Sequence, residues 1–187
     1  MRARLAVGLG DFENAIGQST GAFDRSRSMS NPDLLALSAC AVAFAHLSVG
    51  DHQGVAADVV QGVQMARRAH DPLRALRVRL ISAESHRRQG RRGPALALTR
   101  RIRRLKSSPL PFILRAQVDL LSELLSPANS DDSSVVRRHC QTTGLAGLAL
   151  FAPIRQALSQ QAAAAADIVS ILQCCQSADE ESVTEFT

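Results

Sequence analysis

The sequence has almost no aromatic residues. It contains no Trp and no Tyr, and its six Phe bring the aromatic content to only 3%. β-Sandwiches and β-barrels fill their pleated surfaces with aromatic and β-branched side chains, so this composition argues against both. Leu, Ala, Arg and Gln are abundant instead, and all four favour helices. The composition therefore predicts an all-α protein.

Cysteines and long apolar runs are also scarce. The four cysteines are Cys40, Cys140, Cys174 and Cys175, and none forms a Cys-x-x-Cys pair. This spacing fits neither a disulfide framework nor a zinc site, and it favours reduced thiols. No uninterrupted apolar run approaches the roughly 20 residues of a membrane span, and the N-terminal run 5–9 is too short for a signal peptide. We therefore expect a cytoplasmic protein that does not enter a membrane.

Turn signals recur along the chain at intervals of forty residues. Three glycines, each followed five positions later by a small apolar residue, form one series: Gly10, Gly50 and Gly90. Pro32 and Pro72 form a second series, each preceded by Asn or Asp, and the stretch Ser108-Pro109-Leu110-Pro111 lies near its third place. Asn or Asp before proline is typical of a helix start, and glycine is typical of a helix end. The pattern therefore predicts that each unit consists of a helix that begins at proline, a turn at glycine and a second helix. Stacked units of this kind would share a core.

A known repeat has a similar pattern. The stretch Gly-Asp-Phe-x-x-Ala-Ile at residues 10–16 resembles the turn and second-helix start of a tetratricopeptide repeat. Ala43, Ala45 and His46 fall where that repeat carries its small and aromatic first-helix residues. The resemblance covers roughly residues 1–150, although the spacing of forty exceeds the usual 34 or so. Units of this length resemble the effector-sensing repeats of large bacterial transcription and signalling regulators, such as the maltose-regulator type.

This resemblance implies a fold and a division of the chain. The fold is a right-handed α-solenoid of stacked antiparallel helix hairpins, similar to tetratricopeptide repeats, over residues 1–155, with an incomplete first repeat. Residues 156–187 are expected to form a C-terminal helix and an acidic tail, which is either a cap for the solenoid or a linker to a downstream domain. The incomplete hairpin leaves an apolar end through which copies could form a homo-oligomer.

The expected function is binding rather than catalysis. The concave face of such an array is lined by first-helix residues, here from 34–47, 73–87 and 112–125. The polar candidates on that face are Arg77, Arg79 and Glu84. We expect them to contact a protein or peptide partner or a small effector. The resemblance implies the sensor or scaffold segment of a bacterial regulator whose output domains lie elsewhere.

A cluster of cationic side chains gives a second hypothesis. Lys106 is the only lysine in a chain with 22 Lys and Arg and a net charge of +5. Eight arginines precede it within the segment Arg87–Lys106: Arg87, Arg88, Arg91, Arg92, Arg100, Arg101, Arg103 and Arg104. They form either an anion-binding patch for a nucleic acid or an anionic surface, or a solvated outer face of a repeat. No aromatic residue for base stacking lies between Phe44 and Phe112, which makes nucleic-acid binding the second hypothesis.

No pattern in the sequence indicates catalysis, a metal or a cofactor. His46 and His86 lie forty residues apart, so we expect them to occupy equivalent structural positions. His139 and Cys140 are neighbours in sequence and would point in different directions on a helix, which argues against a catalytic pair. No histidines are spaced to converge on a metal ion, and no nucleotide-binding loop is present. The sequence predicts a protein that is not an enzyme.

Overall fold

A computed structural model describes residues 11–104, 110–126 and 132–144, and these form seven α-helices and no strand. The helices are α2 (Phe12–Ser28), α3 (Pro32–Val49), α4 (His52–Arg68), α5 (Pro72–Arg88), α6 (Arg92–Arg103), α7 (Phe112–Leu124) and α8 (Asp132–Thr143). The all-α prediction is confirmed for these residues. Two compact units, 1–105 and 106–187, divide the chain. The predicted boundary at residue 155, the C-terminal segment 156–187 and Cys174 and Cys175 lie outside the described residues.

The helices begin at regular intervals, at positions 12, 32, 52, 72, 92, 112 and 132. Four of them start at an Asp or Asn whose side chain accepts a hydrogen bond from the backbone of the first turn: Asp11, Asn31, Asp51 and Asp71. Each such cap typically stabilises a helix by about 1 kcal/mol. Pro32 and Pro72 occupy the first turns of α3 and α5, as predicted. Near the third place of this series, Pro111 directly precedes α7, while Pro109 lies outside the described residues.

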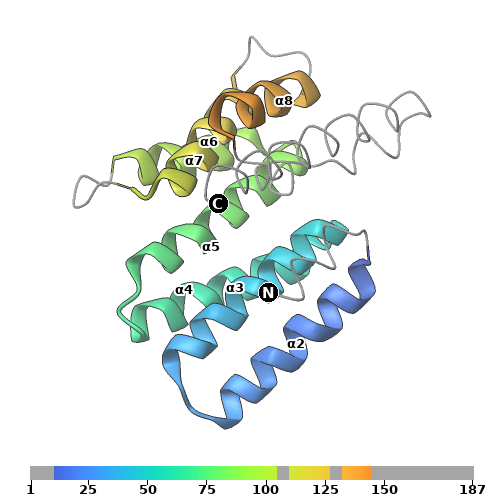
Figure 1. Cartoon of the computed structure of the whole chain (residues 1–187), viewed down its shortest axis with the longest axis vertical. Coiled ribbons are helices and arrows are strands. Elements are labelled where there is room, and N and C mark those ends of the chain that lie inside the picture. The colour runs from blue at the N-terminus through green and yellow to red at the C-terminus, as the bar shows by residue number, and fades with distance from the viewer. Residues whose placement is uncertain (1–10, 105–109, 127–131, 145–187) are drawn as a thin grey trace, which may run out of the picture. The chain divides into compact units, whose positions relative to one another are not determined.

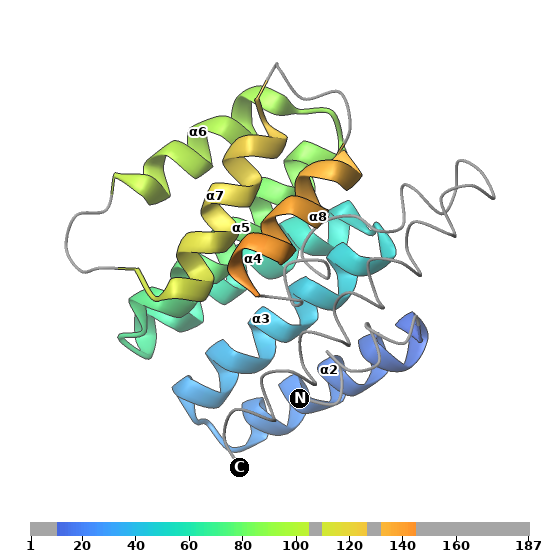
Figure 2. The same cartoon turned by 45° about the horizontal axis from the view of Figure 1, so that its top comes forward.

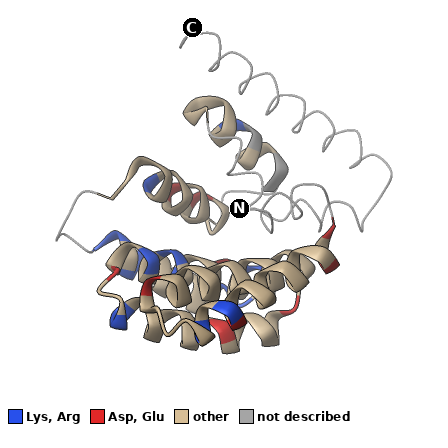
Figure 3. Ribbon diagram, turned by 60° about the horizontal axis from the view of Figure 1, so that its bottom comes forward, with Lys and Arg blue, Asp and Glu red and all other residues tan. Residues whose placement is uncertain are grey.

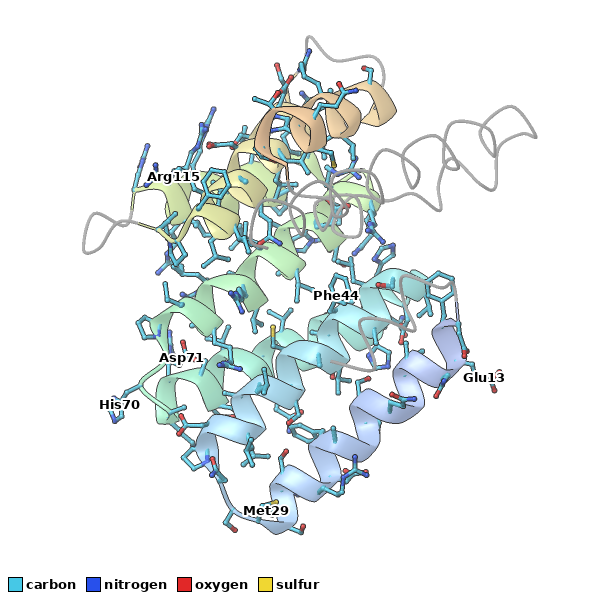
Figure 4. All side chains as sticks on the ribbon, viewed as in Figure 1. Glu13, Met29, Phe44, His70, Asp71 and Arg115 are labelled. Atoms are coloured by element: carbon cyan, nitrogen blue, oxygen red, sulfur yellow. The ribbon has the colours of Figure 1, made fainter. Side chains whose placement is uncertain are left out.

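The helix ends follow the same interval. In the first unit, four residues just after helices have positive φ angles: Ser30 at 53°, Gly50 at 81°, His70 at 51° and Gly90 at 72°. Glycine adopts this left-handed conformation without the steric cost that other residues pay, so the predicted roles of Gly50 and Gly90 are confirmed. Ser30 and His70 adopt it without that advantage. Figure 4 labels His70 at the turn between α4 and α5, with its side chain pointing outward.

Consecutive helices pack against each other throughout the first unit. The packed pairs are α2 with α3, α3 with α4, α4 with α5, and α5 with α6, and α3 also contacts α5 (Figures 1 and 2). The core between α3, α4 and α5 is built around Leu47, Val55 and Ile81, with Ala43 beside them. Burial of a large aliphatic side chain contributes about 1.5–3 kcal/mol, so these residues hold neighbouring hairpins together.

Small residues bring the helices close. A second cluster of the same three helices consists of Ala36, Ala66 and Ala75. At Gly62 of α4, an added Cβ atom would lie only 3.1 Å from a methyl group of Val78 on α5. This contact is tighter than most van der Waals contacts, so the approach of α4 to α5 depends on a residue without a side chain at this position.

The small apolar residues predicted after each glycine are all buried. Ala15 and Ala95 are 0% exposed, and Val55 is 1% exposed. Ala15 of α2 packs against Ala45 of α3, with Phe44 partly buried beside them (Figure 4). These three equivalent positions therefore face the interior of the first unit.

The second unit contains α7 and α8, which pack against each other. The largest buried side chains of α7 include Leu114, Leu120 and Leu121, and α8 buries Val135 and Val136. The predicted amphipathic run 112–125 therefore forms a helix with a buried apolar face.

Helix α3 has an unusual composition. Among the helices in the described ranges, it alone is long and apolar enough to cross a membrane, with 18 residues and a mean hydropathy of 1.6. Its position between α2, α4 and α5 accounts for its composition, because a helix with packed neighbours on several sides is apolar around most of its circumference.

Candidate functional site: an arginine-rich surface on the first unit

The three polar residues predicted for the concave face lie in different environments on α5. Arg77 is exposed, Arg79 is half-buried and Glu84 is 0% exposed. Glu84 therefore offers no surface to a partner, and its prediction as a contact residue is corrected. Arg77 and Arg79 are two residues apart, which separates them by about 200° around a helix. The side chains of Arg77 and Arg79 therefore lie on different faces of α5.

Glu84 is engaged by two arginines of its own helix. Its Oε2 accepts a hydrogen bond from Arg87 Nε at 2.8 Å, and its Oε1 accepts one from Arg88 Nε at 2.8 Å and one from Arg87 Nη2 at 3.0 Å. Arg88 also donates from Nη1 to the backbone oxygen of Leu47 at 2.7 Å. The network therefore ties the end of α5 to the last turn of α3.

Two arginines of the predicted patch, Arg87 and Arg88, have little exposed surface. The side chains of Arg87 and Arg88 are each only 10% exposed. Both are committed to Glu84, because a buried carboxylate needs compensating charge and hydrogen bonds. Arg87 and Arg88 therefore stabilise the fold and offer little exposed surface, and anion binding by the other arginines stays a prediction. Sequence alone could not reveal this role in the fold, because Glu84, Arg87 and Arg88 at helical spacing are also typical of an exposed charged face.

The other six arginines of the patch are exposed. Arg91 and Arg92 lie at the start of α6, and Arg100, Arg101, Arg103 and Arg104 lie at its end. Arg100, Arg101 and Arg104, together with Ala97, line a shallow depression in the surface. The side chain of Arg103 does not line this depression. Figure 3 shows cationic ribbon gathered where α6 ends.

Arg79 on α5 has positively charged neighbours on α4 and α6. Burial lowers the pKa of Arg79 below its usual value, and the nearby charges of Arg67 on α4 and Arg101 on α6 lower it further. These three arginines belong to helices that pack in sequence, α4 with α5 and α5 with α6.

The histidines near the turns have structural partners. His46 Nδ1 lies 2.7 Å from Asp58 Oδ2, which links α3 to α4. The pKa of Asp58 is raised, chiefly by burial, and the contact with His46 opposes that effect. His52 Nδ1 lies 3.0 Å from Ser85 Oγ, and the pKa of His52 is lowered by burial and by the charge of Arg88.

His86 departs from the pattern of His46. Its Nδ1 is buried and has no hydrogen-bond partner. The residue forty positions after Asp58 is Leu98, so the carboxylate that would pair with His86 is missing. Burial and the charge of Arg91 lower the pKa of His86. The two histidines thus occupy corresponding places at the ends of α3 and α5 with different surroundings.

His139 in the second unit contacts a carboxylate. Its Nε2 faces Glu123 of α7, which also pairs with Arg138. Burial and the charge of Arg138 lower the pKa of His139, while the charge of Asp119 raises it. Cys140 is half-buried, and within the described ranges Cys40 and Cys140 do not form disulfides. The contact of His139 with Glu123 joins α7 to α8.

Metal binding has no candidate in the part of the chain that the structure describes. No group of three or more His, Cys, Asp or Glu side chains there is arranged to hold a metal ion. The arginine-rich depression is the chemically most distinctive surface of the first unit. Its guanidinium groups can bind carboxylates or phosphates through paired hydrogen bonds.

Comparison with known proteins gives no relative. No family model, no curated protein and no solved structure matches this chain. The described helices, which pack consecutively, are compatible with a helical repeat.

Proposed function

We propose that this chain is a non-catalytic binding module, the sensor or scaffold segment of a bacterial transcription or signalling regulator that acts in the cytoplasm. Its helices form a right-handed α-solenoid with a forty-residue unit, as in tetratricopeptide-like repeats. The regular helix starts and the matching positive φ angles support this unit. The resemblance noted in the sequence supports the role in a regulator.

One observation carries the proposal: neighbouring first helices leave apolar and polar side chains uncovered at equivalent positions. Leu37 on α3 is 52% exposed, and Arg77, forty residues later on α5, is also exposed. Leu34 and Leu73, at the starts of the same helices, are 36% and 40% exposed. Because α3 contacts α5, these side chains can form a continuous face for a protein or peptide partner.

Photo-crosslinking in cells tests this face. A photoreactive amino acid replaces Leu37 or Leu73 in two variants, and the exposed Asp24 of α2 in a matched control. The proposal predicts one adduct of defined mass from both α3 and α5 positions and none from the control. Equal labelling at all three positions, or no adduct at the two leucines, would contradict a binding face on the first helices.

The exposed arginines of α6 favour a second candidate function, binding of a nucleic acid or an anionic surface. The patch now comprises Arg91, Arg92, Arg100, Arg101, Arg103 and Arg104, since Arg87 and Arg88 are buried. Such binding would weaken steeply with salt as counterions are released. Titration of a single-stranded oligonucleotide at several salt concentrations checks this candidate, and a flat salt dependence would eliminate it.

A further inference from the structure

Helices α3 and α5 carry exchanged chemistry at equivalent positions. Both helices begin at a proline, at positions 32 and 72, and Figure 1 shows that they run in the same direction. The second residue of the helix is Asp33 in α3 and Leu73 in α5, and the sixth is Leu37 in α3 and Arg77 in α5. All four residues are exposed. Each helix therefore has a charge where the other has a leucine.

These four residues form a small patch on the proposed binding face. The second and sixth residues of a helix lie only about 40° apart around its axis and about 6 Å apart along it, so the exposed side of each helix carries both. Helices α3 and α5 contact each other, and the axes of packed helices typically lie about 8–10 Å apart. The patch is therefore a quadrilateral with Asp33 and Arg77 on one diagonal and the two leucines on the other.

Local effects account for only part of this pattern. Asp33 lies in the first turn of α3, where a negative charge is favourable next to the helix dipole. At the start of α5, Asp71 pairs with Arg74 at 2.8 Å, so these two neighbouring charges already match each other. The exposed leucines have no such local reason. Exposed apolar side chains that are grouped together and bordered by charge typically mark a contact surface.

We propose that a second copy of this chain docks on this patch, with a two-fold axis that follows the leucine diagonal. Such an axis places Asp33 of each copy opposite Arg77 of the other copy, and it brings each leucine next to its own counterpart. The interface is self-complementary, because every contact occurs twice. It has apolar side chains at its centre and charged side chains at its rim, as protein interfaces typically do. The inference rests on the proposed binding face and identifies the partner that occupies it.

Charge complementarity favours this axis over the other symmetric arrangements of the patch. An axis parallel to the two helices, or one straight across them, would set each charge against a leucine, and burial of an unpaired charge is costly. An axis along the charged diagonal would set like charges against each other, which is also unfavourable. Only the axis along the leucine diagonal pairs opposite charges and groups the apolar side chains.

Sedimentation equilibrium of the purified full chain tests the inference. It predicts reversible dimers with twice the 20.0 kDa mass of the chain. Asp33→Arg and Arg77→Asp should each raise the dimer dissociation constant at least about tenfold, because two ion pairs across the interface become two like-charge contacts. The control Asp24→Arg reverses an exposed acid of α2 outside the patch and should dimerise as the unmodified chain does.

Mixing the two charge variants gives the sharpest test. Asp33→Arg leaves two positive residues in the patch, and Arg77→Asp leaves two negative ones, so a one-to-one mixture restores opposite charges at both contacts. The mixture should form heterodimers as tightly as the unmodified chain forms homodimers. A substitution that merely damages the fold of one variant would not be rescued by mixing.

Four results would overturn the inference. They are a monomer at every concentration, a dissociation constant that neither charge variant changes, equal weakening by Asp24→Arg, and a mixture that associates no better than the separate variants.

The crosslinking experiment at Leu37 and Leu73 separates this inference from the proposed function. An adduct with twice the mass of the chain supports both. An adduct of any other mass supports the binding face and overturns the second copy as its partner, whereas no adduct contradicts the binding face itself.

Discussion

Replacement of Glu84 by Gln should destabilise the first unit strongly. The carboxylate of Glu84 is completely buried and accepts three hydrogen bonds from Arg87 and Arg88, whose side chains are only 10% exposed. A neutral amide at this position leaves two guanidinium groups almost buried without a counter-charge. Removal of one partner from a buried ion pair typically costs about 3–5 kcal/mol. That is a large part of the roughly 5–15 kcal/mol by which a domain is stable.

The cost should be visible in both thermal and urea unfolding. Each kcal/mol shifts the unfolding midpoint of a domain of 150–250 residues by roughly 2–4 °C, so Glu84→Gln should lower it by roughly 6–20 °C. Circular dichroism at a helix-sensitive wavelength measures the midpoint, and the urea midpoint should fall in parallel with little change in slope. The network also holds the backbone oxygen of Leu47, so the loss should loosen the last turn of α3.

Two further variants control this prediction. Arg74 pairs with Asp71 at 2.8 Å, and both side chains are about a quarter exposed. Arg74→Gln should therefore cost no more than about 1 kcal/mol. Replacement of Glu84, Arg87 and Arg88 together by Met or Leu removes all the buried charge and should cost far less than Glu84→Gln alone. If Glu84→Gln costs no more than Arg74→Gln, the buried network does not hold α5 to α3 as we describe.

Three other predictions follow from the turns and the histidines. Gly50→Ala should lower the free energy of unfolding in urea by about 1 kcal/mol, because φ is 81° at this position and an added Cβ atom meets no neighbour. Gly17→Ala inside α2 should instead raise the free energy of unfolding by up to about 1 kcal/mol. Similar effects at both sites would refute the reasoning. Because the pKa values of His52 and His86 are lowered in the folded chain, the unfolded chain binds protons first as the pH falls. The free energy of unfolding should therefore fall as the pH drops below 6.5 and through the folded pKa values. Replacement of both histidines by Gln should flatten this dependence of the free energy of unfolding on pH, and an unchanged dependence would contradict the prediction. Leu98→Asp should raise the pKa of His86, measured by NMR titration, because it supplies the carboxylate that His46 finds in Asp58; no change would mean that the two hairpins differ here.

The helices and their starts could be predicted from sequence because their signals are local. Asn31 and Asp71 form side-chain caps beside Pro32 and Pro72, and Gly50 adopts the left-handed conformation expected after a helix. Each of these signals concerns a few consecutive residues, so no tertiary contact is needed to recognise it. The left-handed turns at Ser30 and His70 escaped prediction, because residues other than glycine at such positions carry no compositional signal.

The candidate site was less predictable because it depends on contacts between helices. Glu84 resembles a surface residue in sequence, and only its burial next to Arg87 and Arg88 reveals an internal ion-pair network. The positive charge of residues 52–104 could therefore be read from sequence, whereas the engagement of Arg87 and Arg88 by Glu84 could not.

Size-exclusion chromatography of lysates from cells that express the gene, followed by immunoblotting, tests the central claim most directly. The comparison is between the unmodified chain and Leu37→Asp/Leu73→Asp, which changes two exposed side chains and should alter stability by only about 0.5 kcal/mol per site. The account predicts that the unmodified chain elutes in a complex of defined size and that the double variant, folded to the same helix content, no longer does. Elution of both proteins at the same size would contradict a partner-binding face on α3 and α5.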